Sequence, residues 1–197
     1  MEGAKAIIIL AAGASTRLGH PKQLLQYRGR TLLRHSIDTA LASSCRPVIV
    51  VLGANAEQTT PETAGLPVTT VTNLQWAEGV ASSIRAGMDA VIRDEEKPGA
   101  VVIMLCDQPL VTAAFLDRLA TIHQSGRHGI VAAEYGGSGG VPALFDRALF
   151  PELMALRGAE GAKPIIVRYA KDARWIPFPE AAIDIDSEDD VQRLANV

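Results

Sequence analysis

The chain has 197 residues, 48% of them hydrophobic, and a formal net charge of −3. This length suits a single domain with a sizeable buried core, and the slightly acidic balance with no basic tract argues against a nucleic-acid partner. No apolar run approaches the roughly 20 residues that span a bilayer, and the start of the chain lacks a signal-peptide pattern. We therefore expect a cytoplasmic protein with no membrane partner, in which Cys45 and Cys106 are free thiols.

Strand and helix patterns alternate along the first 125 residues. Four aliphatic runs predict strands, and the amphipathic segments between them predict helices. Nearly continuous apolar strands are typical of a parallel sheet that is covered on both faces. The expected strands are 6–10, 47–52, 68–72 and 100–105, and the expected helices are 31–42, 80–92 and 112–124.

The pattern in the rest of the chain is more mixed, and a glycine-rich link at 136–140 separates two apolar runs. Ser187 and Asp190 are spaced like the capping box of a final helix. Taken together, the chain predicts an α/β fold with a mostly parallel sheet flanked by helices. In this part we expect strands at 130–135, 141–145 and 174–178, and helices at 146–156, 162–170 and 187–195.

The most informative segment is an apolar strand that runs into a loop of small residues around Gly13. Glycine lets the backbone approach a ligand closely, and successive N–H groups in such a loop can bind an anion. Arg17 and Lys22 add positive charge where phosphates would lie. Ser15 replaces the second glycine of a dinucleotide-binding fingerprint, and five residues separate Gly13 from Gly19, one more than a P-loop allows. The segment predicts another type of triphosphate loop; the alternative is an ordinary turn with solvated Arg17 and Lys22.

Other polar residues follow neighbouring strands, so we expect them at the same edge of the sheet. Asp107 comes directly after an apolar run, and a hard cation such as Mg²⁺ prefers carboxylate and phosphate oxygens. The alternative is that Asp107 only caps a turn before the helix at 112–124. Near the end of the chain, Asp184 and Asp186 share one face of an extended segment, where a cation would relieve their repulsion.

A third block begins at Gly79, just before the expected helix at 80–92. The first turn of a helix offers unpaired N–H groups, and the hydroxyls of Ser82 and Ser83 lie close to it. Such a turn can bind a phosphate or the polar edge of a base. The ordinary alternative is a capped helix whose serines have only a structural role.

The loop matches the pattern L-A-A-G-x-[ST]-x-R-[LM]-G-x-P-K, and with it the chain resembles the MobA-like NTP transferase family. Within that family it is most similar to the molybdenum cofactor cytidylyltransferases and guanylyltransferases. The C-D-Q-P string at Asp107 and the D-I-D segment at Asp184 and Asp186 resemble further motifs of the family. The resemblance implies one domain with a Rossmann-like nucleotidyltransferase fold, in which about 1–110 bind the nucleotide and about 111–197 bind the acceptor.

The resemblance further implies that CMP passes from CTP to the phosphate of molybdopterin or molybdenum cofactor, with Mg²⁺ or Mn²⁺ as cofactor and pyrophosphate as the leaving group. The implied catalytic residues are Arg17, Lys22 and Asp107, and the implied metal ligands are Asp107 and Asp186, with Asp184 a weaker candidate. Ala12 points to CTP, because the guanylyl branch typically has glycine there. The implied nucleotide-binding residues are Leu10, Ala11, Ala12, Gly13, Arg17, Lys22, Gly79, Ser82 and Ser83, with Ser83 ranked above Ser82.

Three departures from the family pattern concern the acceptor side. Val141 stands where many cytidylyltransferases have histidine, Ala159 replaces the usual aspartate, and Lys163 replaces the usual arginine. They leave the phosphorylated small-molecule acceptor open, and a sugar or polyol phosphate is the alternative to molybdopterin. A non-catalytic nucleotide- or cofactor-binding module is a second alternative. Transient contact with a molybdenum enzyme is a further expectation.

Overall fold

A seven-stranded sheet forms the centre of the computed structural model, which describes residues 3–16, 18–126, 128–185, 187 and 189–190. The strands are β1 (Lys5–Ala11), β2 (Gln26–Tyr27), β3 (Arg30–Thr31), β4 (Val48–Leu52), β5 (Thr69–Thr72), β6 (Ala100–Leu105), β7 (Ile130–Tyr135), β8 (Ser138–Asp146) and β9 (Arg174–Pro177). The order in the large sheet is β5-β4-β1-β6-β8-β7-β9, and β2 pairs separately with β3. All neighbours in the large sheet are parallel except those of β8, which runs antiparallel to β6 and β7. The predicted fold class is confirmed.

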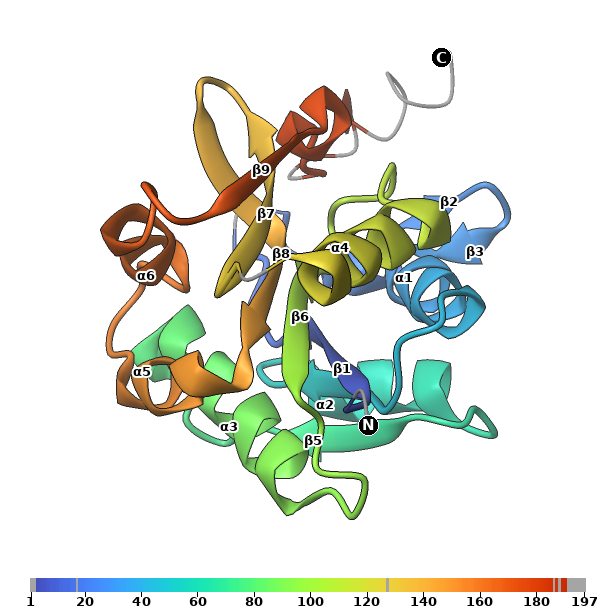
Figure 1. The fold of residues 1–197 in the computed structure, drawn as a ribbon. Coiled ribbons are helices and arrows are strands. Elements are labelled where there is room, and N and C mark those ends of the chain that lie inside the picture. Colours follow the sequence, from blue (N-terminus) through green and yellow to red (C-terminus); the bar gives the residue numbers. More distant parts are fainter. Residues whose placement is uncertain (1–2, 17, 127, 186, 188, 191–197) are drawn as a thin grey trace.

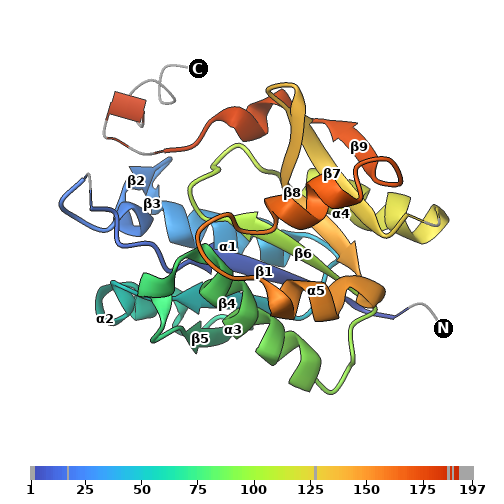
Figure 2. The ribbon, with the colours of Figure 1, turned by 90° about the vertical axis from the view of Figure 1, so that its left-hand side faces the viewer.

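Helices cover both faces of this sheet (Figure 1). Alternate residues of β1 serve the two faces: Ile7 packs with Ile37 of α1 on one side, and Ile8 packs with Met88 of α3 on the other. Figure 2 shows the face that carries α3 and α5. The helices are α1 (Leu32–Ala42), α2 (Ala56–Thr59), α3 (Val80–Arg93), α4 (Ala113–Ser125), α5 (Phe150–Ala155) and α6 (Lys163–Arg168), with 3-10 turns η1 (Lys22–Leu24), η2 (Thr60–Thr63), η3 (Trp76–Glu78), η4 (Arg147–Leu149) and η5 (Pro179–Ala182).

The predicted helix starts agree with the capping contacts. Thr31 accepts a hydrogen bond from the N–H of Arg34 at the start of α1, and Thr112 caps α4 in the same way. At the end of the chain, the Asp190 N–H donates to Ser187 Oγ at 3.2 Å and the Ser187 N–H donates to Asp190 Oδ2 at 2.9 Å, which confirms the capping box. Most of the helix expected at 187–195 lies outside the described residues.

The sequence pattern was less accurate in the second half of the chain. The glycine-rich link at 136–140 does not separate β7 from the next strand, because β8 already begins at Ser138 and extends to Asp146. The helix expected from 146 is divided into η4 and α5. The helical region begins after Asp146, because Asp146 is extended and its carboxylate accepts a hydrogen bond from the Ala148 N–H. The short elements β2, β3 and α2 have too few residues for a detectable period. Among the described residues, no helix is long and apolar enough to cross a membrane.

Candidate active site

A cavity of about 360 Å³ lies beyond the carboxyl ends of β1 and β6. This is the edge at which ligands bind in open α/β sheets. The sequence-predicted residues that line it are Leu10, Ala11, Ala12, Gly13, Lys22, Gly79, Ser83 and Asp107. Ser82 does not line the cavity, and Arg17 and Asp186 lie outside the described residues. The structure therefore brings together three blocks that are up to 97 residues apart, from Leu10 to Asp107.

Lys22 and Asp107 form an ion pair in the wall of this cavity. Lys22 opens η1, whereas Asp107 directly follows β6, so the pair joins the loop after β1 to the neighbouring strand. Their side chains are only 18% and 12% exposed, which reduces solvent screening of the contact. The second carboxylate oxygen of Asp107, Oδ1, is buried and has no hydrogen-bond partner among the described residues. Asp107 thus keeps one acceptor for a cation or a ligand hydrogen.

A buried glutamine holds the glycine loop, and sequence reasoning missed it. The Gln23 side-chain amide donates to the carbonyl of Ala11 at 2.8 Å and to that of Gly13 at 2.9 Å. The Lys22 N–H also donates to Ser15 Oγ at 3.0 Å. A glutamine beside a charged loop residue is usually solvated, and no sequence signal marked this one as buried.

The loop conformation differs from what its glycine suggested. Ser15, with φ of 52°, is in the left-handed region, whereas Gly13 is not among the residues of positive φ. A Cβ on Gly13 would meet no protein atom within 4 Å. Protein packing therefore does not require glycine at this position. A small residue here leaves space for a ligand against the backbone.

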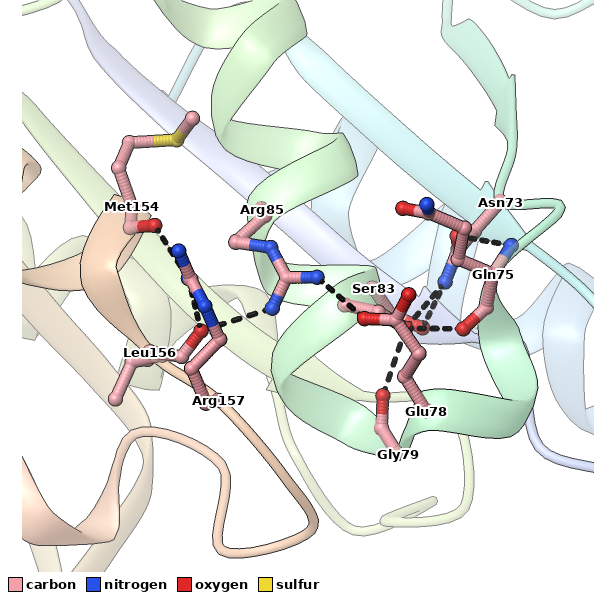
Figure 3. A network of polar contacts seen from close by, with 10 residues as sticks. Asn73, Gln75, Glu78, Gly79, Ser83, Arg85, Met154, Leu156 and Arg157 are labelled. Carbon is pink, nitrogen blue, oxygen red and sulfur yellow. Dashed lines mark hydrogen bonds and ion pairs between the residues drawn. The ribbon is translucent and has the colours of Figure 1, made fainter.

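The two serines of α3 have different surroundings, and Figure 3 shows Ser83 beside Asn73. The Asn73 side-chain amide is buried and donates to Ser82 Oγ at 2.8 Å and to Ser83 Oγ at 3.0 Å. The hydroxyl of Ser82 is also within 2.9 Å of the carbonyl of Gln75, so it is engaged within the protein. Ser83 instead lines the cavity, and its oxygen already accepts from Asn73, so its O–H is the group it can offer to a ligand. Sequence reasoning did not assign Asn73 this orienting role.

The N-terminal turn of α3 is less open than the sequence suggested. Its Ala81 N–H donates to the carbonyl of Gly158 at 3.2 Å, and its Ser82 N–H donates to that of Gly79 at 3.1 Å. The expectation of free N–H groups is wrong for these two, because the segment after α5 supplies the acceptor for Ala81 and the turn itself supplies the acceptor for Ser82. Gly79 has φ of +107°, and a Cβ there would lie 2.6 Å from the Gly158 oxygen, so this close approach requires glycine.

Trp76 also lines the cavity and is 39% exposed. Gly53 approaches this residue closely, because a Cβ on Gly53 would come within 2.9 Å of Trp76 Cβ and 2.6 Å of Ala12 Cβ. Glycine at position 53 therefore leaves room for Trp76 at the cavity.

The C-terminal D-I-D segment approaches Asp107. The N–H of Ile185 donates to the carbonyl of Asp107 at 3.0 Å, and its side chain is fully buried beside Tyr27. Burial raises the pKa of Tyr135, and the negative charges of Asp184 and Asp107 raise it further. The carboxylates of Asp184 and Asp107 therefore both lie near Tyr135. Among the described residues there is no cluster of three or more His, Cys, Asp or Glu side chains that could hold a metal alone.

A second cavity of about 240 Å³ adjoins the first, and Leu10, Val80 and Leu105 line both. Most of its other lining is apolar and comes from α3, β6, β8 and α6. Of the three positions that depart from the family pattern, Val141 and Lys163 line this cavity, whereas Ala159 does not. Its polar lining residues are Tyr135, Ser138, Glu160 and Lys163.

Comparisons with known proteins agree with this geometry. The MobA-like NTP transferase domain matches residues 7–173. Nicotine blue oxidoreductase of Paenarthrobacter nicotinovorans is 34% identical over 169 residues, which cover 82% of this chain and 80% of that protein. The crystal structure of Rv0371c from Mycobacterium tuberculosis H37Rv has a TM-score of 0.84 at 29% identity, with 100% of both chains covered.

Two further solved structures bear on the metal and on the fold. A complex of Rv0371c with manganese has a TM-score of 0.78 at 28% identity, and 100% of both chains is covered. A nucleotidyl transferase from Methanothermobacter, Mth528, has a TM-score of 0.80 at 21% identity, covers 98% of this chain and 96% of its own, and supports the fold alone. The chain belongs to the MobA-like NTP transferase family and is a nucleotidyltransferase.

Proposed function

We propose that this protein transfers CMP from CTP to the phosphate of molybdopterin or molybdenum cofactor and releases pyrophosphate. The observation that carries the proposal is the pair of adjoining cavities. One contains the glycine loop with Lys22 and Asp107, and the other is a mostly apolar pocket that shares the wall formed by Leu10, Val80 and Leu105. The triphosphate of a donor nucleotide and the phosphate of an acceptor could thus come together where the two cavities adjoin.

The reaction needs alignment and charge neutralisation more than a general base. An oxygen of the acceptor phosphate attacks the α-phosphorus of CTP in line, the new P–O bond forms, and the bond to pyrophosphate breaks. A phosphate monoester is largely ionised near neutral pH, so it is already a nucleophile. Lys22, with Arg17 from the sequence motif, would stabilise the triphosphate charge. Holding both reactants in place supplies much of the remaining acceleration.

Asp107 fits the role of a metal ligand. Its buried Oδ1 has no partner in the described part of the chain, and Mg²⁺ is usually held by one or two carboxylates together with substrate phosphates. Asp107, with Asp186 from the D-I-D motif, would hold Mg²⁺ or Mn²⁺ when the nucleotide is bound. The metal would supply charge neutralisation at the phosphates. The manganese complex of the similar Rv0371c supports this assignment.

The first cavity supports a preference for a pyrimidine. The methyl group of Ala12 lines it and is packed beside Gly53, so a larger purine would find less room there. The Ser83 hydroxyl, oriented by Asn73, is a donor that suits the acceptor edge of cytosine.

The mostly apolar second cavity supports a ring-bearing acceptor such as molybdopterin over a sugar or polyol phosphate. A polyol buries several hydroxyl groups that each need a partner, whereas most of this lining is apolar. Lys163 is a cation near which the acceptor phosphate could lie. We place the reaction in the cytoplasm, where the buried thiols of Cys45 and Cys106 would stay reduced, with transient delivery of the product to a molybdenum enzyme.

The test is transfer of label from α-labelled CTP to molybdopterin, with pyrophosphate release measured in parallel. CTP should exceed GTP and ATP, and chelator should abolish transfer. Glucose 1-phosphate and a polyol phosphate serve as competing acceptors, and product formed only with these would replace molybdopterin. One relative is named an oxidoreductase, so nicotinamide-dependent reduction of a heteroaromatic dye is measured as well. Nucleotide binding without any transfer would favour the non-catalytic module.

A further inference from the structure

The segment at 156–163 runs from the end of α5 to Lys163, the first residue of α6, and forms one wall of the second cavity. Four of its residues, 160–163, line that cavity. On its other side the segment packs over the turn that begins α3, where Gly158 accepts a hydrogen bond from Ala81 and approaches Gly79 closely. The same turn, through Gly79 and Trp76, lines the first cavity. The walls of the two cavities therefore meet at this contact.

One arginine connects the two walls (Figure 3). Arg85 extends from α3, and its Nη2 donates to Glu78 Oε2 at 2.8 Å. Its Nη1 donates to the carbonyl of Leu156, also at 2.8 Å. Only 17% of the Arg85 side chain is exposed, compared with 49% for Glu78. The rigid, planar guanidinium can hold both partners at once, which a lysine ammonium does less well.

Arg85 itself lines neither cavity. It can influence a reaction only through the segments it holds. One of these is η3, whose Trp76 lines the first cavity. The other is the segment at 156–163, whose Glu160 and Lys163 line the second cavity. A shift of this segment would move Lys163 relative to Asp107 while the sheet stays intact.

We propose that Arg85 is a positioning residue for nucleotidyl transfer. By holding the segment at 156–163 against α3, it sets the distance between the first cavity, where the nucleotide would bind, and the second cavity, where the acceptor would bind. The inference rests on the proposed two-substrate reaction. In-line attack depends on the relative placement of acceptor and α-phosphorus, and a misplacement of about 1 Å can cost on the order of 100-fold in rate. Arg85 contributes to the reaction by preventing that displacement.

Arg157 provides a matched control. It donates to the same Leu156 carbonyl at 2.7 Å and to that of Met154 at 3.2 Å, so both of its described bonds reach residues at most three positions earlier in the chain. Arg85→Met and Arg157→Met each remove one guanidinium from this carbonyl, but only the first breaks the described link to Glu78. Arg85→Lys keeps the charge, and Glu78→Gln keeps an acceptor while removing the opposite charge.

The experiment combines kinetics with hydrogen exchange. With CTP and molybdopterin, Arg85→Met should lower kcat/KM for the acceptor by roughly tenfold to 100-fold and leave the Kd for CTP within about twofold. Arg85→Lys should recover part of this loss, Glu78→Gln should lose less than Arg85→Met, and Arg157→Met should stay near wild type. Without ligand, amide exchange at 156–163 should be faster in Arg85→Met than in Arg157→Met.

Equal kinetics and equal exchange in Arg85→Met and Arg157→Met would overturn the proposal. A parallel loss of CTP affinity and acceptor turnover would do so as well, because it indicates a general structural role. If the wild-type protein transfers CMP to no acceptor, the proposed function fails instead. The comparison of amide exchange then tests whether Arg85 holds the segment at 156–163, since this measurement requires no substrate.

Discussion

The N-terminal half of the sheet, up to about residue 110, and the C-terminal half hold their cavities in different ways. In the N-terminal half, parallel strands end at one edge, and the buried amides of Gln23 and Asn73 fix the loops that follow them. In the C-terminal half, the cavity wall comes from β8 and from the segment at 156–163, which Arg85 holds from the other half. Hydrogen bonds within the N-terminal half thus hold the loops of the first cavity, whereas contact between the halves shapes the second.

This comparison explains where the chain departs from its family pattern. In the proposed reaction, Lys22 and Asp107 would have to match the charge of a triphosphate and its metal, so few side chains could replace them. An apolar pocket instead recognises mainly shape, and substitutions such as Val141 can alter it while the sheet remains unchanged. The following predictions test whether the two halves can be perturbed separately, from the largest expected effect to the smallest.

Asp107→Asn should have the largest effect. The substitution keeps the shape of the side chain but removes the charge that pairs with Lys22 and would hold the metal. Loss of one such transition-state contact typically costs about 10²–10³ in kcat. Pyrophosphate release at saturating Mn²⁺ measures this effect. Asp186→Asn should be milder and Asp184→Asn mildest; an Asp107→Asn variant with wild-type turnover contradicts the metal assignment.

Arg17→Ala and Lys22→Ala should each lower turnover by roughly 10²–10³-fold, because each removes a cation from the proposed triphosphate site. Their stabilities should differ. Lys22→Ala leaves the partly buried Asp107 without its described ion-pair partner and should lower the melting temperature, whereas Arg17→Ala should melt near wild type. Thermal unfolding and pyrophosphate release are measured on the same samples. Full activity in Arg17→Ala would remove that residue from the phosphate site.

Lys163→Ala should affect only acceptor binding in the second cavity. We expect the acceptor KM to rise about tenfold, the size of a lost hydrogen bond to a charged group, while CTP binding is unchanged. Steady-state kinetics with varied molybdopterin, together with calorimetry of CTP, separate the two effects. Glu160→Gln is a neighbouring control that leaves the Lys163 charge in place. A matching loss of CTP affinity would show that the two halves cannot be separated.

Ser83→Ala should have the smallest effect, a severalfold loss of CTP affinity for one hydrogen bond of about 1 kcal/mol. Ser82→Ala should leave the CTP affinity nearer to wild type, because Ser82 bonds within the protein and lies away from the cavity. Ala12→Gly should narrow the preference for CTP over GTP. Calorimetric titration of both nucleotides measures all three variants, and tighter binding of GTP by the wild type would exclude the cytidylyl assignment.

The sequence by itself determined the features that depend on local pattern. Aliphatic runs predicted β1, β4 and β6, and Thr31, Thr112 and Ser187 marked capping contacts that the structure confirms. The meeting of Gly13 and Asp107 at one cavity was also predictable, since parallel strands place their carboxyl ends at the same edge. Their catalytic and metal roles stay predictions.

Only the tertiary structure decided the contacts between distant segments. It buried Gln23 against the carbonyls of Ala11 and Gly13, and it inserted β8 antiparallel between β6 and β7. It also brought the carbonyls of Leu156 and Gly158 to α3, which paired the Ala81 N–H that was expected to be free and created the link through Arg85. Such bonds join one side chain or one N–H to a backbone carbonyl outside its own helix or strand. Every residue except proline carries the same backbone groups, so no period or motif in the sequence can mark which of them will meet.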